Sequence, residues 1–362
     1  MRRLSHLLPA VAAAFLLGAC SDGNNNATIS TESPRLALEF TSTEAPIDLQ
    51  GINADFAANI EYGEFERNKF DIFLPRDCDD PTPLIIFIHG GGFTGGDKER
   101  YDAEQIREVL QQCIAWATIN YRLLTVPGDA DIAVAKDQGG VRTSLDDTAR
   151  ALQFMRYHFE ILNLAPENVA AWGVSAGAGA SLWLGTHDDL ADPDNADPVL
   201  RESTRIKAAG AVATQATYDV LAWEGVLIDL VEPLAGILGG TDVPTLASNV
   251  GATNYLLTFL GAASLEELES EDRIAYRAEL DMLALMDAGD APIFTENYTT
   301  GFDNLMNMFL HHALHAIAVK KRADEVGLEA VGYSRDPAFP LIDPSQETLT
   351  PFLIRHIQHS SR

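Results

Sequence analysis

The sequence predicts an α/β fold: a mostly parallel central sheet with helices on both faces and a helical cap inserted between two strands. The run LIIFI at 84–88 is continuously apolar, which is expected of a strand buried on both faces. Strand-like and helix-like segments alternate from that run to about residue 213, as they do when helices connect parallel strands. Residues 216–289 then keep helical apolar spacing with little strand signal, which predicts the cap.

The composition fits a large, folded and acidic protein. Of the 362 residues, 46% are hydrophobic and 8% are aromatic, enough to build an extensive buried sheet. There are 25 Lys and Arg against 53 Asp and Glu, a formal net charge of −28. Such a surface repels phosphate backbones, so nucleic acid is excluded as a partner.

Residues 1–20 are interpreted as an export signal. Two arginines precede the apolar stretch 7–17, which is too short to span a bilayer. The order Leu-Gly-Ala-Cys that ends at Cys20 resembles a bacterial lipoprotein signal, in which the Cys is lipidated. An ordinary secretory signal is the alternative, but the polar residues that follow favour lipidation. We expect an exported, lipid-anchored protein; Ser21 favours the outer membrane, facing the periplasm or the cell surface.

A polar tether and N-terminal extension at 21–54 leads into the folded domain, 55–357. Aromatic and β-branched residues predict an antiparallel opening pair at 59–66 and 69–74. Further strands are expected at 84–88, 116–121, 169–174, 207–213, 292–295 and 329–333. Apolar residues recur at helical spacing in 102–112, 146–158, 176–184 and 313–326.

Local signals predict where several helices begin or end. Asp146 and Asp147 suit the first turn of one helix, because carboxylates interact favourably with a helix N-terminus. Ser264 and Glu267 form a capping-box pattern within the cap. Gly327 follows the last long helix, where a C-terminal cap is expected.

Cys78 and Cys113 remain once Cys20 is assigned to a lipid, an even number for an oxidising compartment. They lie just before the strands expected at 84–88 and 116–121. If these strands are parallel neighbours, both cysteines lie at one edge of the sheet and a disulfide is feasible. Two buried free thiols are the alternative.

The strongest chemical signal is GVSAG at 173–177, directly after an expected strand and directly before an expected helix. A Ser on such a tight turn is lifted above the sheet, and the flanking glycines allow the path of the backbone. Ser175 is therefore the predicted nucleophile. The N–H of Ala176, at the helix N-terminus, can face a developing oxyanion.

A second, independent signal follows the buried strand. His89 begins the run HGGG, and successive glycines allow backbone N–H groups to point into a cavity, as an oxyanion hole requires. A phosphate-binding loop would end in Gly-Lys-Ser or Gly-Lys-Thr, which the GDKE at 96–99 does not provide. A plain glycine-rich turn is the other alternative.

These segments carry a family resemblance. HGGGFTGGDK at 89–98, NYRL at 120–123 and GVSAG at 173–177 resemble, in this order and spacing, the hormone-sensitive-lipase and carboxylesterase branch of the α/β hydrolases. The likeness to bacterial feruloyl and acetyl-xylan esterase-like proteins is strongest, over about residues 55–357.

The resemblance implies an α/β-hydrolase fold and specific roles. Backbone N–H groups of Gly91, Gly92 and Ala176 would form the oxyanion hole. Tyr121, Arg122 and Asp147 would be structural, and the cap at 216–289 would contribute to the acyl pocket.

The second half of the chain departs from the pattern of that family. The family expects an acid after the strand at 292–295 and a His in the loop after the strand at 329–333. Residues 334–349 contain no His. The base must therefore come from elsewhere if the site is catalytic.

Three histidines, His311, His312 and His315, offer a displaced base. His312 is best placed at the entry of the expected helix, and Asp303 or Glu296 could orient its second ring nitrogen. Helix capping, packing or substrate contact is the alternative. A metal site is disfavoured because no well-spaced carboxylate accompanies the cluster, and no metal or cofactor is expected.

Together the motifs predict a serine hydrolase that cleaves carboxylic esters through an acyl-enzyme on Ser175. The expected substrates are small-molecule or polysaccharide-linked esters, and Gln215, just past the strand at 207–213, is a candidate pocket residue. A serine peptidase of the same fold is one alternative. A non-catalytic, hydrolase-fold binding lipoprotein is another, favoured by the absence of His from 334–349. The acyl group, the alcohol and the oligomeric state are not specified by the sequence.

Overall fold

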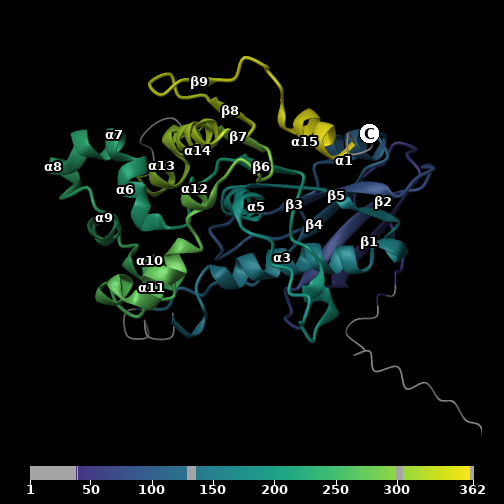
Figure 1. Cartoon of the computed structure of the whole chain (residues 1–362), viewed down its shortest axis with the longest axis horizontal. Helices are drawn as coiled ribbons and strands as arrows, with labels where there is room; N and C mark the ends of the chain where they lie inside the picture. The colour runs from purple at the N-terminus through teal and green to yellow at the C-terminus, as the bar shows by residue number, and fades with distance from the viewer. Residues whose placement is uncertain (1–37, 39, 129–135, 299–304, 359–362) are drawn as a thin grey trace, which may run out of the picture. The chain divides into compact units, whose positions relative to one another are not determined.

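A nine-stranded sheet organises the part of the chain that the computed structural model describes, residues 38, 40–128, 136–298 and 305–358. The strand order is β1-β2-β4-β3-β5-β6-β7-β8-β9 (Figure 1). Pairing is parallel from β4 through β8 and antiparallel for β1, β2 and β9. The strands are β1 Ala54–Glu61, β2 Lys69–Pro75, β3 Thr82–Ile88, β4 Ala115–Ile119, β5 Leu164–Val174, β6 Ala208–Val212, β7 Ile293–Asn297, β8 Ala330–Ser334 and β9 Leu341–Ile342.

The apolar run at 84–88 is the buried centre of this sheet, as predicted. Ile86 pairs with Ala117 of β4 on one side and with Ala171 of β5 on the other. All three side chains are at most 2% exposed. A strand with parallel neighbours on both edges and helices on both faces has no polar face, which explains the absence of alternation.

Helices cover both faces, which confirms the predicted fold class. On one face lie α1 (Ala103–Leu110) and α15 (Leu349–Gln358), and on the other lie α3 (Arg142–Tyr157), α5 (Ala176–Thr186) and α14 (Ala313–Val326) (Figure 1). Adjacent β6 residues show the two faces. A Cβ on Gly210 would touch Leu353 of α15, whereas the Cβ of Ala209 lies against Gly185 of α5. Both interfaces leave room for small side chains only.

The predicted bounds of one strand and one helix differ from those in the structure. The first strand lies at Ala54–Glu61 rather than 59–66, because the residues after it turn back on themselves: Asn68 accepts the Phe65 N–H at 3.1 Å. Helix α3 begins at Arg142, one turn before Asp146 and Asp147. These carboxylates form ion pairs instead of interacting with the N-terminus of the helix. Asp147 binds the Arg122 guanidinium through both oxygens, at 2.7 and 2.8 Å.

Residues 213–292, all of them described, contain helices and turns but no strand. Figure 1 shows α6 through α11 gathered beyond one end of the strands. The helices of this cap are α6 Trp223–Val226, α7 Ile228–Val231, α8 Ala235–Leu238, α9 Val243–Asn249, α10 Thr253–Leu260, α11 Glu271–Ala278 and α12 Met282–Leu285, with 3-10 turns at Val220–Ala222, Glu232–Leu234 and Glu266–Glu269. A further 3-10 turn, Pro198–Arg201, precedes β6, and two further helices are α4 (Phe159–Leu162) and α13 (Leu305–His311).

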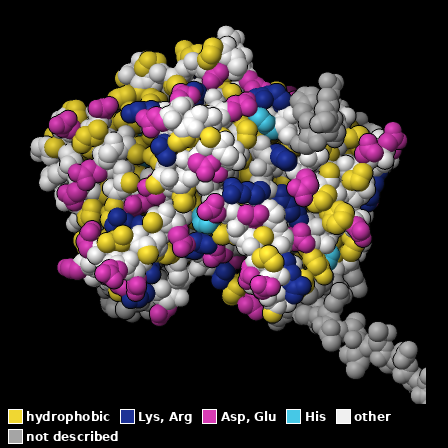
Figure 2. Space-filling view, viewed as in Figure 1, with side chains coloured by type: hydrophobic (Ala, Val, Ile, Leu, Met, Phe, Trp, Pro, Cys, Tyr) yellow, Lys and Arg dark blue, Asp and Glu magenta, His cyan; other side chains and the backbone are white. Residues whose placement is uncertain are grey.

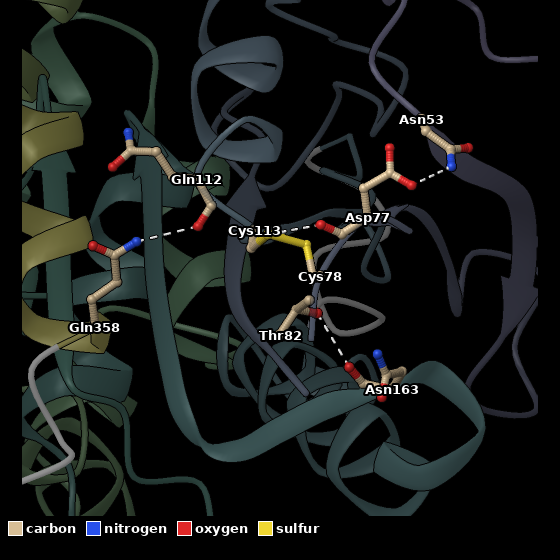
Figure 3. The surroundings of a disulfide bond; sticks show 8 residues. All are labelled: Asn53, Asp77, Cys78, Thr82, Gln112, Cys113, Asn163 and Gln358. Carbon is tan, nitrogen blue, oxygen red and sulfur yellow. Dashed lines mark hydrogen bonds between the residues drawn. A yellow bond between two sulfur atoms is a disulfide. The ribbon is translucent and has the colours of Figure 1, made fainter. Parts of the chain in front are cut away.

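Cys78 and Cys113 form a disulfide in the structure (Figure 3). Their Cα atoms lie 5.8 Å apart, and the bond joins the segment after β2 to the segment between α1 and β4. In the same region the Thr82 hydroxyl donates to the carbonyl of Asn163 at 3.2 Å. The disulfide closes a loop of 35 residues far along the chain from the cap.

Acidic and basic side chains are interleaved over the face shown in Figure 2, and apolar side chains are scattered between them. On this face the acidic side chains are therefore spread out rather than gathered in one block. Among the described residues, no helix combines the length and the apolar character that crossing a bilayer requires.

Candidate active site

Ser175 lies on the sharp turn between β5 and α5. Its φ of 57° and ψ of −120° are strained values for a residue with a side chain, which cost about 1–3 kcal/mol. The turn is held by a hydrogen bond from the Ser175 N–H to the carbonyl of Val212, at 2.9 Å, and α5 begins with the Ala178 N–H on the Ser175 carbonyl. The fold thus supports a strained position that lifts the side chain above the sheet.

The flanking glycines are required by close backbone contacts. A Cβ on Gly173 would lie 2.3 Å from the carbonyl carbon of Gly177, and one on Gly177 would lie 2.0 Å from the carbonyl oxygen of Ile88. A Cβ on Gly90 would lie 2.6 Å from the carbonyl oxygen of Val174. The glycine loop after β3 and the serine turn after β5 therefore pack backbone to backbone.

The glycine loop takes conformations that favour glycine, with φ of 121° at Gly91 and 61° at Gly92. The start of this loop is fixed by His89, which is fully buried. Its Nδ1 donates to the carbonyl of Gly90 at 2.7 Å. Burial lowers the pKa of His89 to about 4, so the ring is neutral. Arg67 donates to the carbonyl of Gly96 at 2.9 Å, which fixes the far end of the loop.

Two of the three expected oxyanion donors line the cavity that contains Ser175. These are Gly92 and Ala176; Gly91 is not part of that lining. Among the described residues, none accepts a hydrogen bond from the N–H groups of these three positions. Unpaired N–H groups beside a nucleophile are the donors that an oxyanion requires.

His311 brings an imidazole to the Ser175 hydroxyl. Its Nε2 lies 2.8 Å from Ser175 Oγ, and its Nδ1 lies 2.7 Å from Oδ1 of Asn307, one turn earlier on α13. An amide oxygen only accepts, so Nδ1 carries the proton and Nε2 is free to take one from the hydroxyl. The arrangement has the geometry of a nucleophile, a base and an orienting group, with a neutral amide in the third position.

Burial lowers the pKa of His311 below its ordinary value. The neutral ring is the form that accepts a proton, so this shift keeps the base available at neutral and mildly acidic pH. A carboxylate in place of Asn307 would act in the opposite direction, because a negative charge stabilises the imidazolium.

Side chains outside α13 bind the carbonyls at its C-terminal end, which the helix itself leaves unpaired. Nε2 of His315 donates to the carbonyl of Phe309 at 2.8 Å, and Nε2 of Gln215 donates to the carbonyl of Leu310 at 2.7 Å. His315 is fully buried, and its pKa is lowered to about 4 by burial. These two contacts fix the last turn before His311.

Asn297, at the end of β7, completes this arrangement. Its Nδ2 donates to the carbonyls of His311, at 3.3 Å, and His312, at 3.0 Å, and its Oδ1 accepts the Thr214 N–H at 2.9 Å. The Asn297 side chain is fully buried. It therefore connects the ends of β6 and β7 to the backbone that carries His311.

The structure brings His311, and not the expected His312, to Ser175. His312 is the N-cap of α14: its Nδ1 accepts the Leu314 N–H at 3.2 Å, and its Nε2 faces the Asp336 carboxylate at 3.9 Å. A ring used in this way points away from the nucleophile, so the choice within the histidine cluster is corrected. Asp303, the expected orienting acid, lies outside the described residues.

The three histidines do not converge on a metal position. His311 faces Ser175, His312 caps α14, and Nδ1 of His315 accepts the Ala216 N–H at 3.2 Å. The described ranges contain no group of three or more His, Cys, Asp or Glu side chains that could hold a metal ion.

The positions at which the resemblance expects the acid and the His hold an ion pair instead. Glu296 of β7 and Arg335, just after β8, approach to 2.6 Å. The Arg335 side chain is 69% exposed and the Glu296 side chain 18%, so the pair is solvated on its arginine side. Glu296, the second carboxylate considered as a partner for the base, is thus engaged away from His311.

The cavity at Ser175 has a volume of about 30 Å³ and an aromatic wall. The Tyr255 hydroxyl donates to the carbonyl of Gly92 at 2.7 Å, and the Tyr218 hydroxyl donates to the carbonyl of Ala176 at 2.5 Å. Burial raises the pKa of Tyr255 to about 12, so it remains a hydroxyl donor. Gln215 also lines this cavity, as expected.

Solved structures with the same architecture define the class. A truncated form of a carbohydrate esterase from gut microbiota is 15% identical, with a TM-score of 0.54 over 83% of this chain and 96% of that chain. A bacterial heroin esterase is 17% identical, with a TM-score of 0.51 over 86% of each chain. The fold is that of the α/β hydrolases.

Within that class, the BD-FAE family model matches residues 70–258, just over half of the chain. The chain belongs to the BD-FAE family. The matched segment includes the glycine loop, Ser175 and most of the cap, and it ends before β7.

Curated relatives match over shorter stretches. A probable isoprenylcysteine alpha-carbonyl methylesterase of Arabidopsis thaliana is 24% identical over 41% of this chain and 29% of its own length. Para-nitrobenzyl esterase of Bacillus subtilis is 28% identical over 33% of this chain and 25% of its own length. Gut esterase 1 of Caenorhabditis elegans is 31% identical over 30% of this chain and 19% of its own length. The chain spans less than a third of the length of these relatives.

Two functional candidates were missed in the sequence. Asn307 precedes His311 by four residues, the spacing at which side chains meet on a helix, but α13 was not expected. Asn297 is the last residue of β7, the strand at whose end the resemblance expects a functional residue. Its bonds to a distant backbone have no local sequence signal.

Proposed function

We propose that this protein is a carboxylic ester hydrolase that forms an acyl-enzyme on Ser175. The observation that carries the proposal is the 2.8 Å contact between Ser175 Oγ and His311 Nε2 on a strained strand-to-helix turn. Family membership and the esterase names of the relatives support the same chemistry. The alcohol portion of the substrate is a small molecule or a polysaccharide, the second in line with the carbohydrate esterase of similar fold.

The proposed reaction has two halves. Ser175 Oγ attacks the ester carbonyl carbon while His311 Nε2 takes its proton, and the carbonyl oxygen becomes an oxyanion. The N–H groups of Gly92 and Ala176, which line the cavity, stabilise it, each contributing about 3–4 kcal/mol in the transition state. The imidazolium protonates the departing alcohol, and water activated by His311 then releases the carboxylic acid. Asn307 keeps the His311 proton on Nδ1 throughout.

Two measurements test this proposal. The purified protein should hydrolyse p-nitrophenyl acetate, and a fluorophosphonate probe should label it, with both signals lost in Ser175→Ala. A chromogenic dipeptide amide serves as the paired substrate. Turnover of the dipeptide without the ester would indicate a peptidase. Absence of turnover and of labelling above the Ser175→Ala background would indicate a non-catalytic binding protein.

We also propose that the mature protein is exported and anchored by a lipid on Cys20. Ser21, the next residue, favours the outer membrane. The Cys78–Cys113 disulfide supports an oxidising compartment, because such bonds are rare in reducing cytosol. In a bacterial host, labelled palmitate should enter the protein and the protein should fractionate with membranes. Cys20→Ala should abolish both. Labelling that survives this substitution would contradict the assignment.

A further inference from the structure

Two tyrosine hydroxyls of the cap bind the backbone of the two residues that line the cavity as oxyanion donors. The Tyr255 hydroxyl, on α10, donates to the carbonyl of Gly92 at 2.7 Å. The Tyr218 hydroxyl, just before α6, donates to the carbonyl of Ala176 at 2.5 Å. Gly92 and Ala176 belong to separate segments, after β3 and after β5. The cap therefore contacts both halves of the proposed oxyanion hole.

The Gly92 peptide needs a contact from outside its own loop. Glycine adopts positive and negative φ with similar ease, so a run of glycines does not by itself fix the direction of an N–H group. The carbonyl of Gly91 is held within the loop by the N–H groups of Thr94 and Gly95, each at 3.1 Å. The carbonyl of Gly92 is held by Tyr255 instead. A Cβ on Gly92 would lie only 3.1 Å from the Tyr255 hydroxyl oxygen, so the contact is close.

Aromatic packing fixes the position of this hydroxyl. The ring centroid of Phe259, also on α10, lies 6.1 Å from that of Tyr255. Phe93, the residue after Gly92, lies 5.9 Å from Phe259 and 5.4 Å from Tyr218 between ring centroids. Phe93 and Tyr218 are both 1% exposed. The glycine loop and the cap therefore share one buried aromatic cluster.

We infer that Tyr255 is a positioning residue of the active site, which acts by holding the Gly92 peptide so that its N–H group faces the oxyanion. The single proton of the Tyr255 hydroxyl is engaged by Gly92, so it is not itself given to the substrate. Tyr218 has the same role at Ala176, with a smaller effect because the first turn of α5 also holds Ala176. The inference rests on the proposed esterase function.

Removal of one hydroxyl tests the inference. Tyr255→Phe keeps the ring and its packing, and it should lower kcat for p-nitrophenyl acetate by about tenfold to a hundredfold with KM within about threefold. Tyr276→Phe is the matched control. The Tyr276 hydroxyl, on α11, also joins the cap to a glycine carbonyl, that of Gly139 at 3.2 Å, but it does not line the cavity at Ser175. Both constants should stay within about twofold in this control.

Two kinetic outcomes would overturn the inference. Equal kcat values in Tyr255→Phe and Tyr276→Phe would show that the hydroxyl on Gly92 has no special role. A loss in Tyr255→Phe that is confined to KM would indicate a substrate contact rather than positioning.

A transition-state analogue separates positioning from a general loss of stability. Ser175 Oγ adds reversibly to the carbonyl carbon of trifluoroacetophenone, His311 takes the hydroxyl proton, and the ketone oxygen becomes an oxyanion in the hole. The inhibition constant should rise about tenfold or more in Tyr255→Phe and stay unchanged in Tyr276→Phe. An unchanged inhibition constant in Tyr255→Phe would contradict the positioning role.

If circular dichroism shows that Tyr255→Phe does not fold, Tyr218→Phe decides the inference. It should lower kcat by about threefold to tenfold and raise the inhibition constant by the same factor. Values equal to those of the unmodified protein would overturn the inference and leave the esterase proposal intact. Loss of all ester turnover and of fluorophosphonate labelling in the unmodified protein would instead reject the proposed function.

Discussion

The turn after β5 and the segment after β7 bring the two reacting groups to the same edge of the sheet, and they do so by different means. At the turn, Ser175 is placed by its own neighbours. Gly173 and Gly177 lie so close to other backbone atoms that a Cβ would not fit at either position. After β7, His311 is placed by side chains outside its own helix that bind the carbonyls of residues 309–312. The position of Ser175 depends on local sterics, whereas the position of His311 depends on tertiary hydrogen bonds.

This difference explains how the base can occupy a new position while the nucleophile keeps its motif. A strained turn tolerates few sequences, so its pattern is fixed. An imidazole needs only to reach the hydroxyl, and any well-supported backbone on the same edge can carry it. Here the end of α13 takes that role, and the positions expected for the acid and the base hold the Glu296–Arg335 ion pair.

The largest effect is expected from removing the base. His311→Asn should lower kcat/KM for p-nitrophenyl acetate by about 10⁴-fold, because the hydroxyl loses its proton acceptor. His312→Asn is the matched control: Asn is a good N-cap, so α14 should stay capped and activity should remain within about threefold. Steady-state kinetics on both variants measure the contrast. A larger loss in His312→Asn would return the role to His312.

The turn should be broken by a single methyl group. Gly177→Ala places a Cβ 2.0 Å from the carbonyl oxygen of Ile88, and we expect a loss of about 3 kcal/mol or more in the free energy of unfolding. Gly236→Ala in α8 is the control, since nothing lies within 4 Å of its added Cβ. It should be neutral or stabilising by up to about 1 kcal/mol. Urea unfolding followed by circular dichroism compares them; equal stabilities would refute the steric argument.

The support of His311 should be sensitive to one buried amide. Asn297→Asp removes the Nδ2 donor and leaves the carbonyls of His311 and His312 without it. We expect a loss of about 2–3 kcal/mol in stability and a fall in kcat of tenfold to a hundredfold with little change in KM.

Glu296→Gln, one residue earlier, is the control for Asn297. It breaks only the solvated ion pair with Arg335 and should cost less than about 1 kcal/mol, with activity unchanged. If Glu296→Gln lowered kcat as much as Asn297→Asp, an acid at the end of β7 would be part of the machinery after all.

The smallest effect concerns pH. Burial lowers the pKa of His311, so the acid limb of kcat/KM should have its midpoint below the ordinary His value of 6.5. Asn307→Asp places a negative charge beside Nδ1, which raises the pKa of His311 and should move that limb to higher pH by about one unit. An unchanged profile would remove Asn307 from the role of orienting group. If Asp303→Asn abolished activity instead, that carboxylate would be the orienting group.

Much of the fold was predictable because its signals are local. The continuous apolar run of β3, the boundaries of α14 and its capping Gly327 all follow from short-range patterns. Helix α13 was not predicted: it has seven residues and depends on side chains of residues 215, 297 and 315 for its last carbonyls. Propensity alone does not specify so short a helix.

The sequence by itself determined the position of Ser175, the proposed nucleophile, and its glycine surroundings, because steric exclusion at a tight turn acts between near neighbours and between two short motifs. It also limited the base to a cluster of three histidines. Only the tertiary structure decided among them, since His311 and His312 are adjacent in the chain and point in different directions. The direction of His311 is set by hydrogen bonds from Gln215, just after β6, and from Asn297, at the end of β7, which no local pattern encodes.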